Sequence, residues 1–215
     1  MTTFLDLGIP FPLFEADVTE AGDYLGPGQC NLCDQKFVHC FDVNEVTFIG
    51  STPPYFSTKN AAVCYGCLRA GKAAFTKDTV LGMVTWKEAM EGLTHGEPGL
   101  RLADFELIPS QHDPQWMRAK VPSEFLLELV RTPTYNTWQG ERWQFCCKRP
   151  MIYAGIWKEE EFKKNSPNGN GQELFATAKI DGVAADMWGH LEEIGGPYMF
   201  RCSSCGTLRG HYDMD

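Results

Sequence analysis

Apolar and polar positions along this chain form short patterns that change every few residues. Residues 36–49 place apolar side chains at near-alternate positions, and many of these are β-branched or aromatic, which favours strands. The same reasoning predicts strands at 151–157, 198–200 and 208–212, and a shorter one at 105–108. Together these segments predict small antiparallel sheets.

Helical signals are equally short. Residues 123–130 follow Pro122, carry an apolar face and stop before Pro133, so they predict a helix. Thr85 and Glu88 have the spacing of a capping box and predict a second helix. Further short helices are expected within 61–76, beginning around Cys64, at 158–162, from 172 onward, and at 183–193 before Gly195 and Gly196.

Prolines and glycines punctuate the rest of the chain. Residues 4–25 predict an extended arm that is anchored on the body by its apolar side chains. Residues 94–120 are rich in turn residues, which is typical of an inserted segment or a mobile loop. We therefore expect an α+β fold with one domain over 1–215, arranged as two lobes at about 1–80 and 120–215 that an inserted segment, 82–120, joins.

Length and charge narrow the function classes. The chain has 215 residues and a formal net charge of −9, from 19 basic and 28 acidic residues. So acidic a chain is a poor candidate for binding nucleic-acid phosphates and suits a basic protein partner better. It shows neither a secretory signal nor an apolar run near the eighteen or so residues of a membrane span, so we expect a cytoplasmic protein without membrane contact.

Cysteine spacing gives the strongest chemical signal. Three C-x-x-C pairs and one vicinal pair hold all the cysteines except Cys40. Two residues between the sulfurs allow a tight turn in which both thiolates reach one ion, so such pairs are typical of zinc sites. A reduced cytoplasmic chain argues against disulfides, and the presence of three pairs argues against a thioredoxin-like motif, which needs one.

The pairs predict two zinc ions per chain. The first site takes Cys30, Cys33, Cys64 and Cys67. The second takes Cys147, Cys202 and Cys205, with Cys146 as the best fourth ligand and His211 as the reserve. Successive side chains of an extended strand diverge, so Cys146 and Cys147 can share an ion only if the chain turns at Cys146.

Catalytic signals are absent from the sequence. There is no glycine-rich phosphate loop, G-x-S-x-G or H-E-x-x-H motif, and the histidines have no triad spacing. Sulfur-rich zinc sites are closed, so we do not expect an enzyme. The aromatic residues of 135–147 could stack on bases or sugars, or fill a small core; the adjacent cysteines favour the core.

In their order along the chain, these motifs resemble the CbrC family. The resemblance runs from about residue 14 to residue 215. It is most specific in R-T-P-x-Y-x-x-W-Q-x-x-x-W-x-x-C-C at 131–147 and in Y-M-F-R-C-x-x-C-G at 198–206. The chain departs from the family pattern at 64–67, where C-Y-G-C replaces C-P-W-C, at Cys146, which replaces His, and at 82–120, which is longer.

The resemblance implies a bacterial cytoplasmic zinc-knuckle protein linked to tolerance of a nuclease colicin. On this basis we expect an immunity protein that binds and neutralises a toxin, such as the nuclease domain of a colicin-like or secreted effector. The acidic contact candidates are Glu159, Glu160, Glu161, Glu192, Glu193, Asp213 and Asp215. A zinc-dependent enzyme or a nucleic-acid-associated stress factor is the alternative.

Overall fold

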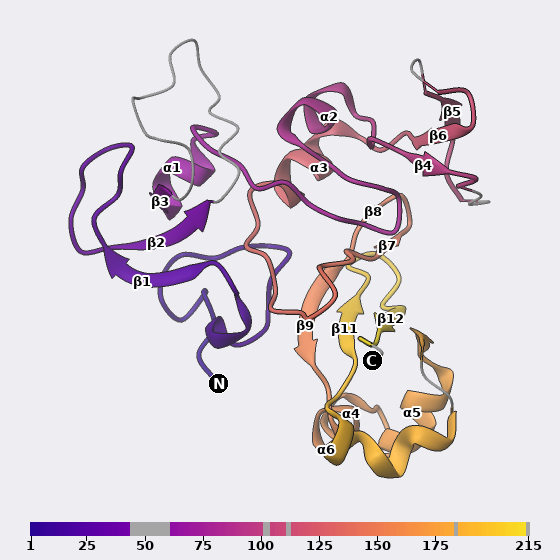
Figure 1. Ribbon diagram of the computed structural model, residues 1–215. Coiled ribbons are helices and arrows are strands. Elements are labelled where there is room, and N and C mark those ends of the chain that lie inside the picture. The colour runs from indigo at the N-terminus through magenta and orange to yellow at the C-terminus, as the bar shows by residue number, and fades with distance from the viewer. Residues whose placement is uncertain (44–60, 101–103, 111–112, 183–184, 214–215) are drawn as a thin grey trace.

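The computed structural model describes residues 1–43, 61–100, 104–110, 113–182 and 185–213 (Figure 1). Short helices are mixed with small sheets, in which the strand pairs are antiparallel with one exception. This is the α+β architecture that the sequence predicts. Within the ranges just given, no helix combines the length and the apolar character needed to cross a bilayer.

The N-terminal sheet consists of β1 (Tyr24–Gly28), β2 (Val38–Val43) and β3 (Ala61–Cys64), all antiparallel in that order. β2 confirms the strand prediction over 38–43, whereas 44–49 lie outside the described residues. The arm before β1, which contains the 3-10 turn η1 (Val18–Glu20), packs on this sheet through Phe4. The Phe4 ring is fully buried and lies 5.5 Å from that of Phe41, so the arm is anchored as expected.

The helix expected within 61–76, from around Cys64, begins as predicted at Tyr65 but ends early, at Arg69. Residues 61–64 form β3 because they pair with β2, with Val63 opposite Phe41 in the register. Helix α1 (Tyr65–Arg69) begins only after Cys64, and it ends before Gly71, whose φ of +68° is left-handed. The chain then runs towards the helix that follows Pro122.

Two helices begin where the sequence predicts. α2 (Trp86–Glu91) begins with both bonds of the capping box between Thr85 and Glu88, and Gly92 ends it at a φ of +68°. α3 (Ser123–Leu129) follows Pro122 and buries Leu126 and Leu129. The two helices pack against each other (Figure 1).

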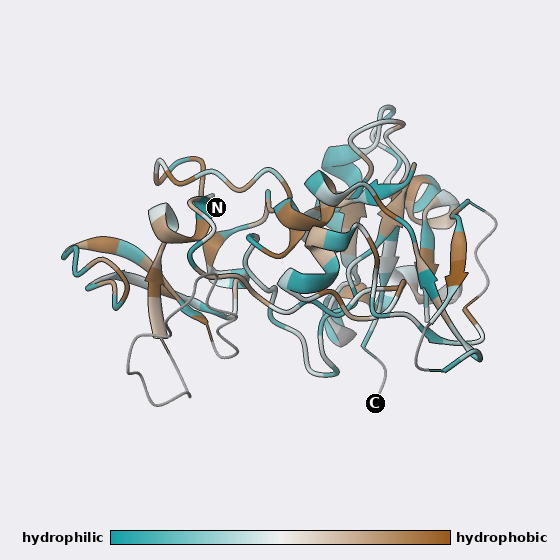
Figure 2. Ribbon diagram, turned by 90° about the horizontal axis from the view of Figure 1, so that it is seen from above, coloured by the Kyte–Doolittle hydropathy of each residue, from teal (hydrophilic) through white to brown (hydrophobic). Residues whose placement is uncertain are grey.

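Residues of the expected insertion form a third sheet, with β4 (Glu97–Pro98), β6 (Trp116–Ala119) and β5 (Leu107–Pro109) in that order. The strand predicted at 105–108 begins two residues later, at Leu107, and ends one residue later, at Pro109. This sheet and the N-terminal sheet lie on opposite sides of the molecule, and hydrophobic residues are spread over many short elements (Figures 1 and 2). The division into two lobes stays a prediction.

The C-terminal sheet has the order β10-β12-β11-β9. Its antiparallel strands β9 (Ile152–Ile156), β11 (Tyr198–Arg201) and β12 (Leu208–His211) match the predicted strands closely. The parallel strand β10 (Lys179–Asp181) was not predicted. A two-stranded hairpin of β7 (Phe145–Cys146) and β8 (Arg149–Pro150) precedes this sheet in sequence.

Aromatic side chains from 135–147 fill the core, as the sequence favours. Tyr135 and Trp143 are buried, and the Tyr135 ring stacks on that of Tyr153 with centroids 4.6 Å apart. Trp138 is the exception, because 91% of it is exposed.

Helical elements gather at one end of the C-terminal sheet, which we call the helical end (Figure 1). It comprises α4 (Glu159–Asn165), α5 (Gly171–Thr177), the 3-10 helix η2 (Ala185–His190) and α6 (Leu191–Ile194). The helix expected at 183–193 is therefore mostly a 3-10 helix, and residues 183 and 184 lie outside the described residues. These elements enclose a second small core around Phe162 and Phe175, which are separate from the main core.

Candidate metal centres

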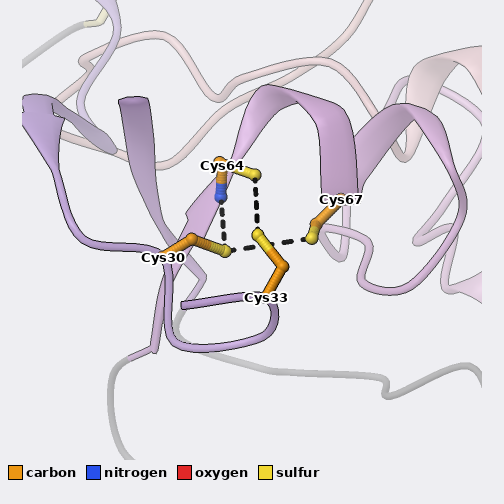
Figure 3. Close-up of side chains that lie close together, drawn as sticks. All are labelled: Cys30, Cys33, Cys64 and Cys67. Atoms are coloured by element: carbon orange, nitrogen blue, oxygen red, sulfur yellow. Dashed lines mark hydrogen bonds between the residues drawn. The ribbon is translucent and has the colours of Figure 1, made fainter. Parts of the chain in front are cut away.

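The first cysteine group joins the β1–β2 turn, the end of strand β3 and helix α1 (Figure 3). Cys30 and Cys33 lie in the turn between β1 and β2, Cys64 ends β3, and Cys67 lies in α1. All four sulfurs lie within 4.8 Å of one another. The Cys30–Cys67 and the Cys33–Cys64 sulfur pairs are both 3.8 Å apart.

The second group joins the β7–β8 hairpin to the end of β11. Its members are Cys146, Cys147, Cys202 and Cys205, and their sulfurs also lie within 4.8 Å of one another. The sulfur of Cys146 is 3.8 Å from that of Cys147 and 3.7 Å from that of Cys205. Cys146 therefore completes the group, as the sequence favours.

These separations fit zinc. Four sulfurs placed tetrahedrally, each about 2.3 Å from one ion, are about 3.8 Å apart. All nine cysteines are free, and disulfide sulfurs would be only about 2 Å apart. Four thiolates form a soft ligand set that suits zinc. Each group could therefore hold one zinc ion, which gives two per chain.

The two knuckles share one backbone geometry. In the first, the N–H of Leu32 donates to the Cys30 sulfur and the N–H of Asp34 to the Cys30 carbonyl. In the second, Ser204 and Gly206 make the same two bonds to Cys202. The residue after each second cysteine has a left-handed φ, +58° at Asp34 and +72° at Gly206. Gly206, which lacks a Cβ, adopts this φ without steric cost.

A tight turn lets two adjacent cysteines face one point. Cys147 and Lys148 have φ values of +52° and +59°, and they link the paired residues Cys146 and Arg149. Two successive left-handed residues are the mark of a type I′ hairpin turn. The turn expected at Cys146 thus lies one residue later, because Cys146 itself belongs to β7.

One thiol in each group ionises readily. Burial disfavours the Cys30 thiolate, but N–H donors from Cys64 and Leu32 outweigh burial and lower the pKa of Cys30 to about 7. At Cys205 the hydroxyl and the N–H of Thr207 lower the pKa to about 6. Burial raises the pKa of Cys146 to about 12. Metal binding must therefore displace protons from other thiols of each group.

Two residues near the groups lie outside them. Cys40 is buried beside the first group, its sulfur lies 3.4 Å from the Val38 carbonyl oxygen, and burial raises its pKa to about 11. His211, the reserve ligand, lies in the core with Nε2 2.8 Å from the hydroxyl of Tyr135.

The fold brings most acidic candidates to the helical end. Glu159, Glu160 and Glu161 form the first turn of α4, and Glu192 and Glu193 lie in the first turn of α6. Lys158 Nζ lies 3.3 Å from Glu192 Oε2 and so links the two helices. Asp215 lies outside the described residues.

Asp213 has an internal role. Its Oδ2 accepts hydrogen bonds from the Thr137 hydroxyl at 2.7 Å, from the N–H of Trp138 at 2.8 Å and from the Tyr198 hydroxyl at 3.1 Å. These bonds fix the turn at 137–140 and lower the pKa of Asp213 against the effect of its partial burial.

Sequence reasoning missed one buried charge cluster. Lys77 is fully buried, and its Nζ lies 3.3 Å from Glu141 Oε2. Burial raises the pKa of Asp23, which is also buried, and the charge of Lys77 offsets part of this effect. The three residues are far apart in sequence and share no motif, so the sequence gives no signal that they meet.

A family profile described as an uncharacterised protein family, UPF0167, matches residues 16–214. The chain belongs to the UPF0167 family. It is similar to UPF0167 protein PA1536 of Pseudomonas aeruginosa, with 33% identity over 106 residues, or 45% of this chain and 55% of that protein. This UPF0167 chain thus spans about half the length of the curated relative it matches. No solved structure matches it.

Proposed function

We propose that this UPF0167 chain is a binding protein whose fold is held by two zinc ions. Each group offers four sulfurs, which fill the four positions of tetrahedral zinc and leave none for water or substrate. The sulfurs of each group come from separate elements of small sheets, so an ion at each place would hold these elements together. Such closed sites stabilise a fold and do not catalyse.

The partner in this proposal is a basic protein, namely a toxin of the nuclease class. The chain carries a net charge of −9, and two zinc ions bound by eight thiolates would contribute about −4 more. Nuclease toxins must bind phosphate, so their active faces tend to be basic and would attract an acidic protein. The motifs shared with the CbrC family support the same class of function.

The observation that carries the partner proposal is an open cavity of about 770 Å³ beside the helical end. Trp138, Glu193 and Asp213 are among the residues that line it. Trp138 is 91% exposed, yet its turn is held in place by the bonds to Asp213. An exposed tryptophan on a hydrogen-bonded turn, beside carboxylates, is suited to be an interface hot spot for a basic partner. We call this surface the Trp138 face.

The test is co-expression with a basic toxin encoded beside this gene. We expect the cells to survive, and we expect native mass spectrometry of the purified complex to give two zinc ions per chain. Trp138→Ala should weaken the complex by about 2 kcal/mol or more, roughly thirtyfold. Glu193→Lys should slow association, with the effect shrinking as salt rises.

Glu124→Lys provides a matched control, since Glu124 is exposed on α3 and lies outside the Trp138 face. It should leave association and affinity close to those of the unmodified chain. If neither protection nor a complex at low salt were found with any such toxin, immunity would be abandoned for the zinc-enzyme alternative. A metal content of one zinc or none in fresh, reduced protein would contradict the zinc part separately.

A further inference from the structure

A second cavity, of about 530 Å³, opens beside the turn at 137–140 and is strongly acidic. Four carboxylates line it, and they come from four separate segments: Asp23, Asp42, Asp78 and Glu141. Among the described residues that line the cavity there is no lysine, arginine or histidine. We call it the carboxylate cavity.

The ammonium group of Lys77, in the buried charge cluster, already contacts other groups. Lys77 does not line the cavity, and its Nζ lies 3.3 Å from Glu141 Oε2 and 3.0 Å from Thr134 Oγ1. It also lies 5.0 Å from the centre of the Phe75 ring. One ammonium group therefore serves two buried carboxylates, Glu141 and Asp23, and can balance only one of them when both are ionised.

Two carboxylates at the wall, Asp23 and Asp42, are also short of hydrogen bonds, since Oδ1 of each is buried without a partner among the described residues. Asp23 is only 8% exposed, and its Oδ2 accepts the N–H of Thr134 at 2.9 Å. Its Oδ1 is buried and has no hydrogen-bond partner among the residues that the structure describes. A buried acceptor without a donor costs about 1–3 kcal/mol, and more when the group is charged.

Burial raises the pKa of Asp23 to about 6 and that of Glu141 to about 7, although Lys77 acts to lower both. The fold therefore holds two carboxylates in a place where their charged forms are disfavoured. Groups in this condition are common in binding and active sites, where a ligand restores the balance of charge.

We propose that the carboxylate cavity binds an organic cation, an ammonium or guanidinium group that donates hydrogen bonds to Asp23 and Glu141. Such a group would pair with ionised carboxylates at the cavity wall through charge-assisted hydrogen bonds. Phe75 and Tyr135 also line the cavity, and aromatic rings bind organic cations well.

The spread of the carboxylates argues for an organic cation over a metal ion. In the part of the chain that the structure describes, the two cysteine groups are the only sets of three or more side chains close enough to share one ion. The oxygens of Asp23, Asp42, Asp78 and Glu141 are therefore too far apart to bind a single small ion together. A guanidinium or a diamine, with several donors over a few ångströms, can reach more than one of them.

The cation could be a free small amine or the side chain of a lysine or arginine from another protein. Two probes separate these sources: putrescine stands for a free diamine, and N-acetyl-arginine amide for a protein side chain. Each is titrated into the zinc-loaded protein by calorimetry, with sodium chloride at matched ionic strength as the baseline. We expect saturable binding of at least one probe, with one site per chain.

Asp23→Asn and Glu141→Gln keep the shape of each side chain and remove its charge, so each should weaken binding about tenfold or more. Glu124→Gln, exposed on α3, makes the same charge change elsewhere and should leave binding unchanged. Circular dichroism and zinc content identify any variant that has not folded. If one of the two cavity variants does not fold, the other still tests the proposal. Absence of saturable binding by both probes, or unchanged binding to folded Asp23→Asn and Glu141→Gln, would overturn the proposal.

Discussion

At the scale of single residues, the position of the sulfur atom distinguishes a cysteine that can bind zinc from one that only fills space in the core. Cys30 and Cys40 are both fully buried and both belong to the N-terminal sheet region, yet only Cys30 joins the four-sulfur group. Cys30→Ser should therefore remove one zinc ion and lower the melting temperature sharply, because metal binding is coupled to folding. Zinc content and thermal unfolding measure both effects.

Cys40→Ala is the matched control, since it removes a buried sulfur beside the same group without removing a ligand. It should keep two zinc ions and cost about 1 kcal/mol through the small cavity it leaves. Equal loss of zinc in both variants would show that the ligand assignment is wrong.

What the sequence reveals at this scale depends on spacing. Cys202 and Cys205 are recognisable because both ligands of a knuckle come from one short turn, so their chemistry is visible in a four-residue window. Asp23 and Glu141 could not be recognised as candidate binding residues from the sequence. Their raised pKa values come from burial beside Lys77, and burial is a property of the folded chain.

At the scale of elements, the β7–β8 hairpin makes the second cysteine group possible. Its turn needs left-handed φ values at Cys147 and Lys148, and such a φ costs a residue other than glycine about 1 kcal/mol. Lys148→Gly should therefore stabilise the protein by up to about 1 kcal/mol, and Lys148→Val should destabilise it and weaken zinc binding. Urea unfolding and a zinc competition assay measure the two effects.

Lys164→Gly makes the same substitution inside α4, where glycine is unfavourable, and should destabilise the protein by up to about 1 kcal/mol. Opposite signs for the two glycine variants would identify the turn as the cause. A loss of stability in Lys148→Gly would contradict the assigned turn.

Elements were predictable where a local signal sets their ends. Thr85 and Glu88 form their capping box and α2 follows, because both bonds lie within one turn. The start of α1 near Cys64 was predicted, but strand β3 at 61–64 was missed because its pairing with β2, distant in sequence, decides that these residues are extended. Strand β10 was missed for the same reason, since its partner β12 lies almost thirty residues away.

At the scale of the whole molecule, stability should depend on pH through the two buried carboxylates. In the unfolded chain their pKa values return to about 4. In the folded chain burial raises them to about 6 for Asp23 and about 7 for Glu141. Between about pH 4 and pH 7 the folded state thus binds more protons than the unfolded state, so this contribution to stability falls as pH rises.

The glutamine of Glu141→Gln cannot ionise, so this variant should not lose the stability that the unmodified protein loses through Glu141 as pH rises. Its melting temperature relative to that of the unmodified protein should therefore rise from about pH 5.5 to about pH 8. Lys77, Asp23, Asp78 and Tyr135 surround Glu141, and they are the same in both proteins, as are the zinc ligands, so the difference isolates Glu141. Glu124→Gln, on the exposed side of α3, should follow the unmodified protein at every pH. A Glu141→Gln difference that stayed constant over this range would show that Glu141 does not titrate there, and that Lys77 holds it ionised throughout.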